Sequence, residues 1–167
     1  MKAHELFGAI STTLATEILE FTFQNDKALY RATLDAVAQA RKVRSVFMER
    51  QPRAERHATM AVYLARPNLE MASDGLLRNW LLKSHTSLLV DFLDTLKIKH
   101  DKGVVDELPP TVEDEALKAA IEGLLSKYSN EIVTIYLHAF HQMNETRWPN
   151  LENLLKTDPR LELKRHV

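Results

Sequence analysis

Apolar residues recur at steps of three and four along most of this chain, which is the spacing of amphipathic α-helices. The pattern predicts a first helix over residues 3–23, a second over 27–50 and a third over 52–65. Asp26 stands directly before the second helix and can accept hydrogen bonds from its first N–H groups, so we expect it to be an N-cap. Pro52 fits the first turn of the third helix, because that position needs no N–H donor.

The second and third helices carry contrasting apolar faces. Phe47 belongs to the stripe of the second helix, so we expect it in the core. The third helix has a face of small residues, which permits the close approach of a neighbouring helix: Ala54, Ala58, Ala61 and Ala65. We therefore expect tight packing against this face.

Residues 76–96 and 120–140 are interpreted as two copies of one helix-turn-helix unit, offset by 44 positions. Trp80 corresponds to Leu124, and Phe92 corresponds to Tyr136. Each copy has a short polar break between two apolar helices. The whole pattern predicts an all-α fold with seven to eight helices in antiparallel hairpins. Either a single compact bundle or a short HEAT-like stack satisfies it.

The length of 167 residues favours a single all-α domain over residues 1–167, with 1–73 and 74–167 as possible sub-halves. The long stretch from Lys99 to Pro110 is expected to connect the two hairpin copies. The basic end of the chain, Lys164-Arg165-His166, is expected to be loosely held.

Composition removes several classes of function. The chain contains no cysteine, which excludes disulfides and thiolate chemistry and favours a cytoplasmic location. No apolar run approaches the length of about 18 residues that spans a membrane. The four glycines are isolated, so no phosphate-binding loop or nucleotide fingerprint exists, and no Gly-x-Ser-x-Gly elbow is present. We expect no cofactor and no catalytic residues, and a role as an enzyme is disfavoured.

Charge is distributed unevenly, although the net charge is only −1. Residues 31–66 are rich in cations, and residues 101–122 are rich in carboxylates. These faces are expected to be solvated or to neutralise one another, within one chain or across a dimer. The basic segment offers a second hypothesis, the binding of phosphate or nucleic acid, by Arg41, Lys42, Arg44, Arg50, Arg53 and Arg56. Few aromatic residues accompany these cations, which disfavours the binding of single-stranded nucleic acid.

Two histidines and a carboxylate form the sharpest constellation of possible metal ligands. On a helical wheel, His138, His141 and Glu145 share one narrow face, and this set of ligands suits zinc, iron or manganese. That face lies opposite the apolar stripe, so the simpler interpretation is a polar surface in contact with solvent. The leading hypothesis for the chain is therefore an interaction or structural module that self-associates or docks a protein partner. A helical-bundle metal-binding protein or metalloenzyme is the alternative.

Overall fold

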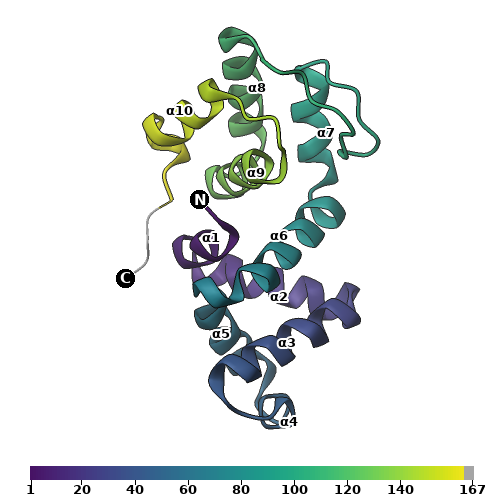
Figure 1. Cartoon of the computed structure of the whole chain (residues 1–167), viewed down its shortest axis with the longest axis vertical. Helices are drawn as coiled ribbons and strands as arrows, with labels where there is room; N and C mark the ends of the chain where they lie inside the picture. The colour runs from purple at the N-terminus through teal and green to yellow at the C-terminus, as the bar shows by residue number, and fades with distance from the viewer. Residues whose placement is uncertain (164–167) are drawn as a thin grey trace. The chain divides into compact units, whose positions relative to one another are not determined.

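The computed structural model describes residues 1–163, which form ten α-helices and two short 3-10 helices without any β-strand (Figure 1). The all-α class is confirmed, and the helices are more numerous than the expected seven to eight. The described residues divide into two compact units, Met1–Trp80 and Leu81–Leu163, so the division lies seven residues after the expected sub-half boundary at 73. The basic end Lys164-Arg165-His166 lies outside the described residues.

The first unit is built around helix α5, against which α1, α2 and α3 pack. Its elements are α1 (Ala3–Ala9), α2 (Thr12–Asn25), α3 (Lys27–Arg41), α4 (Ser45–Glu49), α5 (Arg53–Leu64), the 3-10 helix η1 (Pro67–Leu69) and most of α6 (Glu70–Ser84). Glu70 at the start of α6 caps the N-terminus of α1. Its carboxylate accepts hydrogen bonds from the backbone N–H groups of Ala3 and His4, at 3.1 and 2.9 Å.

Two of the predicted helices are divided in the structure. The helix expected over 3–23 breaks before Ser11, whose hydroxyl accepts a hydrogen bond from the N–H of Leu14 and caps α2. The helix expected over 27–50 begins as predicted, and Asp26 is confirmed as its cap through the N–H of Leu29. It ends at Arg41 because Lys42 adopts the left-handed conformation, with φ of 59°.

That left-handed residue changes which side chains of α4 are buried. Met48 is fully buried, whereas Phe47, expected in the core, is 54% exposed. The alanine face of α5 is also covered only in part, because Ala61 is buried while Ala54 and Ala58 are exposed. The expectation of tight packing along the whole alanine face is therefore wrong, and open space remains beside it.

The second unit is formed by α7 (Thr86–Thr95), α8 (Asp114–Lys127), α9 (Asn130–Met143), α10 (Pro149–Thr157) and the 3-10 helix η2 (Pro159–Leu161). Helix α7 packs on α8, and α9 packs on α8, α10 and η2. Its aromatic core places Phe92 edge-to-face against Tyr136 and Phe140, with ring centroids 5.4 and 5.3 Å apart. Trp148 continues the cluster, 5.3 Å from Phe140.

The two sequence copies are placed differently in the structure. The boundary between the two units falls inside α6, at Trp80, and so cuts the first copy, whereas the second copy lies wholly in the second unit. The break between α6 and α7 consists of His85 alone. Matched positions such as Phe92 and Tyr136 are core residues in both copies. The offset of 44 positions therefore aligns residues that are buried in both copies, although the two copies pack in different surroundings.

The connection between α7 and α8 is a long loop fixed to the second unit by side-chain hydrogen bonds. Trp148 Nε1 donates to the carbonyl of Pro109 at 2.9 Å, and Asn150 Nδ2 donates to the carbonyl of Val112 at 2.8 Å. Gly103 has a φ of 88°, and a Cβ placed there would lie 2.7 Å from the Cβ of Leu89. This turn therefore requires glycine.

Two glycine substitutions in the second unit should have opposite effects. Gly103→Ala is expected to lower the free energy of unfolding by about 2–4 kcal/mol, since it adds both a strained φ and a clash with Leu89. Gly123→Ala lies in α8 with no atom within 4 Å of the added Cβ, and it should raise the free energy by about 0.5–1 kcal/mol. Urea unfolding of the two variants and the wild type measures both; equal stability of the two variants would contradict the role given to Gly103.

Candidate functional site

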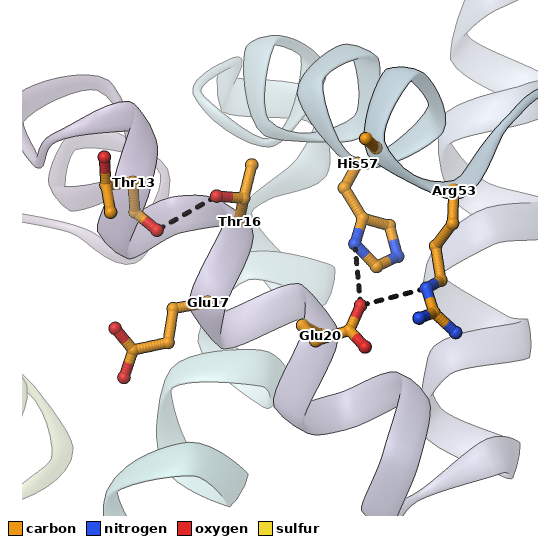
Figure 2. A pocket seen from close by; sticks show the side chains of 7 residues that line it. Thr13, Thr16, Glu17, Glu20, Arg53 and His57 are labelled. Atoms are coloured by element: carbon orange, nitrogen blue, oxygen red, sulfur yellow. Dashed lines mark hydrogen bonds and ion pairs between the residues drawn. The ribbon is translucent and has the colours of Figure 1, made fainter.

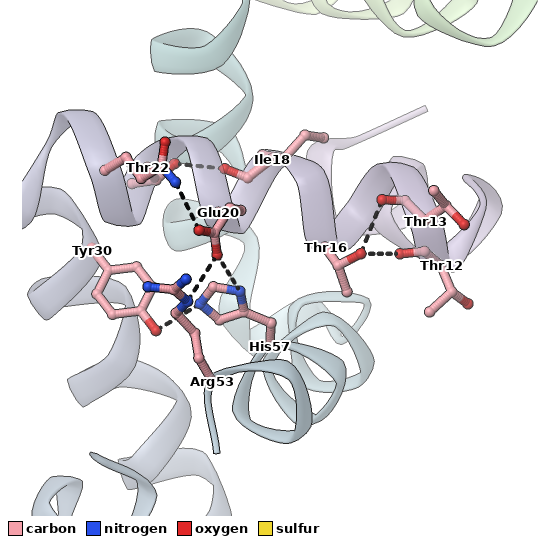
Figure 3. Close-up of polar contacts among 10 residues, drawn as sticks. Thr12, Thr13, Thr16, Ile18, Glu20, Thr22, Tyr30, Arg53 and His57 are labelled. Carbon is pink, nitrogen blue, oxygen red and sulfur yellow. Dashed lines mark hydrogen bonds and ion pairs between the residues drawn. The ribbon is translucent and has the colours of Figure 1, made fainter. Parts of the chain in front are cut away.

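Three helices of the first unit bring a carboxylate, an imidazole and a phenol into one line. Glu20 comes from α2, Tyr30 from α3 and His57 from α5 (Figure 3). The Tyr30 hydroxyl lies 2.8 Å from His57 Nε2, and Glu20 Oε2 lies 3.6 Å from His57 Nδ1. The imidazole therefore has an oxygen facing each of its two nitrogens.

The environment keeps His57 neutral. The residue is 3% exposed, and burial is the main cause that lowers its pKa to about 4. The Glu20 carboxylate opposes this shift, whereas the nearby guanidinium groups of Arg56 and Arg53 reinforce it. Burial also raises the pKa of Tyr30. With both rings neutral, the consistent arrangement has the phenol donating to Nε2 and Nδ1–H directed at Glu20.

Two arginines pack beside these groups and form one polar wall with them. Arg53 Nε pairs with Glu20 Oε2 at 3.2 Å, and the Arg53 guanidinium lies 4.6 Å from the centre of the Phe23 ring. Arg56 is buried, lies about 6 Å from the rings of Phe23 and Tyr30, and donates to the carbonyl of Glu49 at 3.2 Å. These contacts hold the side chains of α5 against α2 and α3.

An open hollow of about 560 Å³ lies in front of this wall (Figure 2). It is lined by Thr13, Thr16, Glu17, Glu20, Arg53, Ala54 and His57. The Thr16 hydroxyl donates to the backbone carbonyls of Thr12 and Thr13. Glu17 is exposed and makes no ion pair within the described part of the chain, so its carboxylate is available to a ligand. We call this space the polar hollow.

The side chains that line a second hollow, of about 250 Å³, are apolar except for that of Thr12, and backbone atoms add polar surface to it. It is lined by Phe7, Gly8, Ile10, Thr12, Ala15, Ala58, Ala61, Val62 and Ala65. Adjacent residues of the same helices line the two hollows: Thr12 and Thr13 on α2, and His57 and Ala58 on α5. The alanine face of α5 thus forms part of both, and we refer to the two together as the α2–α5 groove.

The geometry limits what His57 can do as a general base. A general base needs a nucleophile or an acidic proton within hydrogen-bond reach. The Tyr30 phenol is such a group, but it is buried and burial raises its pKa, so it stays protonated. Neither threonine hydroxyl of the polar hollow bonds to His57 among the described residues. The groove presents apolar side chains beside charged and hydroxyl groups.

The predicted metal ligands are separated by the end of α9. The helix ends at Met143, so Glu145 leaves the face that the wheel assigned to it, and its side chain is exposed. His138 and His141 are only 8% and 7% exposed, so the interpretation of a solvent-facing polar surface is wrong. The packing of α10 and η2 on α9 accounts for the burial. Within residues 1–163 no group of three or more His, Cys, Asp or Glu residues is arranged to hold a metal ion.

His141 is held in an apolar setting near one cation. Burial and the neighbouring Arg147 both lower the pKa of His141. Its Nε2 lies 3.5 Å from Arg147 Nη1, and its Nδ1 has no hydrogen-bond partner among residues 1–163. The lowered pKa keeps the His141 imidazole neutral. Neutrality alone does not make a metal site, because a metal ion needs further ligands.

The six cations considered for phosphate binding do not share one surface. Arg56 is buried, Arg53 is paired with Glu20, and Arg41 is half-buried. The remaining cations, Lys42, Arg44 and Arg50, are exposed on either side of α4. The basic segment is therefore divided between the wall of the polar hollow and the surface around α4.

Sequence reasoning did not single out the Glu20–His57–Tyr30 arrangement. In the sequence Glu20 is one of several polar positions in the first predicted helix, and His57 is one of seven histidines. The sequence gives only a weak signal for this arrangement. One face of α2 carries polar residues at steps of three and four: Thr13, Thr16, Glu17 and Glu20. Nothing in that spacing indicates which helix faces them.

Comparison of the chain with models of protein families, with curated proteins and with solved structures gave no match. The site is therefore interpreted from its geometry. None of the helices in the described part of the chain is both long enough and apolar enough to cross a membrane.

The free energy of unfolding of the first unit should decrease as the pH is lowered below about 6.5, the ordinary pKa of histidine. The unfolded chain binds a proton on His57 near that value, whereas the folded chain does so only near pH 4. Protonation between these values therefore favours unfolding, by about 3 kcal/mol at most. His57→Gln removes this titration.

Urea unfolding followed by circular dichroism at several pH values measures the difference. The free energy of unfolding of the wild type should decrease relative to His57→Gln as pH falls from 6.5 to 4. His141 is present in both proteins, so its own titration cancels. Parallel pH profiles of the two proteins would contradict a buried, neutral His57.

Proposed function

We propose that this chain is a protein-interaction module that binds a segment of a partner protein in the α2–α5 groove. One observation carries the proposal: an apolar hollow and a polar hollow lie on adjacent residues of the same two helices. An amphipathic peptide meets such a surface with an apolar anchor on one side and a polar residue on the other.

The apolar hollow supports an aliphatic or aromatic anchor. Ala58 is exposed, Val62 is 62% exposed, and the alanine side chains leave space between α5 and its neighbours. Covering this surface removes apolar area from water, which stabilises the complex by about 25 cal/mol per Å² before the costs of association.

The polar hollow supports a basic residue in the partner. The Glu20 carboxylate is shared between Arg53 and Gln24, with Gln24 Nε2 donating at 2.9 Å, whereas no described residue bonds to the Glu17 carboxylate. A lysine or arginine beside the anchor therefore finds Glu17 available. The contacts of Arg53 and His57 with Glu20 fix the wall in advance, so less ordering accompanies binding.

Selection from a library of random peptides displayed on phage tests this function with a defined probe. Enriched peptides should combine a large apolar residue with lysine or arginine. Ala58→Trp fills the apolar hollow and should weaken binding of the selected peptides at least about tenfold, measured by isothermal titration calorimetry. Glu17→Lys should weaken the same peptides through repulsion.

The matched control is Ala119→Trp, which places the same side chain on the exposed face of α8 and should leave binding unchanged. Peptides that bind Ala58→Trp as tightly as the wild type, or a selection without enrichment, would remove the groove as the binding surface.

A further inference from the structure

Helix α1 covers one side of the α2–α5 groove. It packs on α5 and on the 3-10 helix η1, and its residues Phe7 and Gly8 line the apolar hollow together with the following Ile10. A Cβ placed on Gly8 would lie 3.5 Å from the Cβ of Ala65, so the backbone of α1 runs close to the alanine face of α5. The helix therefore covers the Ala65 end of that face.

One carboxylate holds the first turn of α1. Glu70 accepts hydrogen bonds from the backbone N–H groups of Ala3 and His4, at 3.1 and 2.9 Å, and its Oε2 lies 2.5 Å from His4 Nδ1. Glu70 is half-buried and stands at the start of α6. Because three contacts share this single group, a change at Glu70 loosens the whole first turn of α1.

The other end of α1 is a joint of two residues. Ile10 and Ser11 both have an extended backbone, with φ of −81° and −62°, so the hydrogen bonds of α1 end before those of α2 begin. Helix α1 has seven residues, whereas an isolated helix needs about 12–15 to be stable in water. Its structure therefore depends on its contacts with the rest of the unit, and such a segment opens locally without unfolding the helices that it covers.

The closed groove is small for the anchor of a peptide. The apolar hollow measures about 250 Å³, below the roughly 300–1,000 Å³ of most ligand pockets. Movement of α1 removes the wall formed by Phe7 and Gly8 and widens this hollow. The polar hollow is lined by residues of α2 and α5, so that half of the groove keeps its form when α1 moves.

We infer that α1 is a lid on the α2–α5 groove. The contact with Glu70 keeps the lid shut, and release of that contact lets α1 turn about Ile10 and Ser11 and admits the apolar anchor of the partner. The inference rests on the proposed function, since it names the step that regulates peptide binding in the groove. A ligand that binds only the open state is weakened in proportion to the fraction of open molecules.

Reaction of buried cysteines with a thiol reagent measures this opening without any peptide. The chain has no cysteine, so each variant carries a single thiol. Ala9 is 2% exposed and lies at the joint end of α1, where fraying of the first turn does not reach it; Ala38 in α3 is 1% exposed and is the matched control. Ala9→Cys should react at least about tenfold faster than Ala38→Cys in the absence of denaturant.

Glu70→Gln weakens the hold on α1 without altering a residue that lines the groove. It should speed the labelling of Ala9→Cys more than that of Ala38→Cys, and peptides selected on the wild type should bind about threefold to tenfold more tightly. Glu115→Gln removes the same charge from α8 and should leave the affinity unchanged. A purely structural role of Glu70 would lower the affinity or leave it unchanged, and either result would contradict the lid.

A disulfide across the lid gives the converse test. Gly8→Cys/Ala65→Cys places the two Cβ atoms 3.5 Å apart, within the range that a disulfide spans. The oxidised variant has its lid locked, and the selected peptides should bind it at least about tenfold more weakly than the same variant reduced with dithiothreitol. Both states carry the same substitutions, so the difference between them measures the effect of the lock. Equal binding by the two states would overturn the lid.

The lid and the proposed function fail separately in these experiments. A selection that enriches no peptide would remove the proposed function of the groove, whatever the labelling rates. Equal labelling of Ala9→Cys and Ala38→Cys would remove the lid, even where peptides bind the groove.

Discussion

An imidazole buried among helices is most stable with a partner for each of its nitrogens, because an unsatisfied buried polar group costs about 1–3 kcal/mol. His57 meets this requirement with groups from two other helices, the phenol of Tyr30 and the carboxylate of Glu20. The demand fixes the rotation of α2, α3 and α5 about their axes. Arg53 and Arg56 then complete the polar wall, and the hollow in front of it follows from that geometry.

The alanines of α5 have a second consequence for the same surface. Small side chains let α5 lie close to α1 and α2, as the burial of Ala61 shows, yet they do not fill the space at the margins. Exposed Ala58 therefore lies beside an apolar hollow. A larger residue there would close the space. Small residues thus allow close packing in the middle of α5 and leave an open hollow at its edge.

Several features of the fold were predictable because they are local. Asp26 is an N-cap by its own chemistry, and the all-α class follows from apolar spacing within each segment. The break before Ser11 and the left-handed Lys42 were missed, since the apolar stripe continues through both. A single left-handed residue rotates everything after it, so Met48 takes the buried position expected for Phe47.

The candidate site could not be predicted from local sequence patterns. A helical wheel shows which side chains share a face, but it does not show what covers that face. For His138 and His141 the wheel indicated solvent, and the packing of α10 and η2 buried both.

By itself the sequence determined the helices, most of their ends and the uneven distribution of charge, because these depend on neighbours within one or two turns. Only the tertiary structure decided that His57 meets Glu20 and Tyr30 and that Phe47 faces solvent. Contacts between helices that are distant in sequence depend on how whole helix faces fit together. The periodicity of one helix does not indicate which helix packs against it.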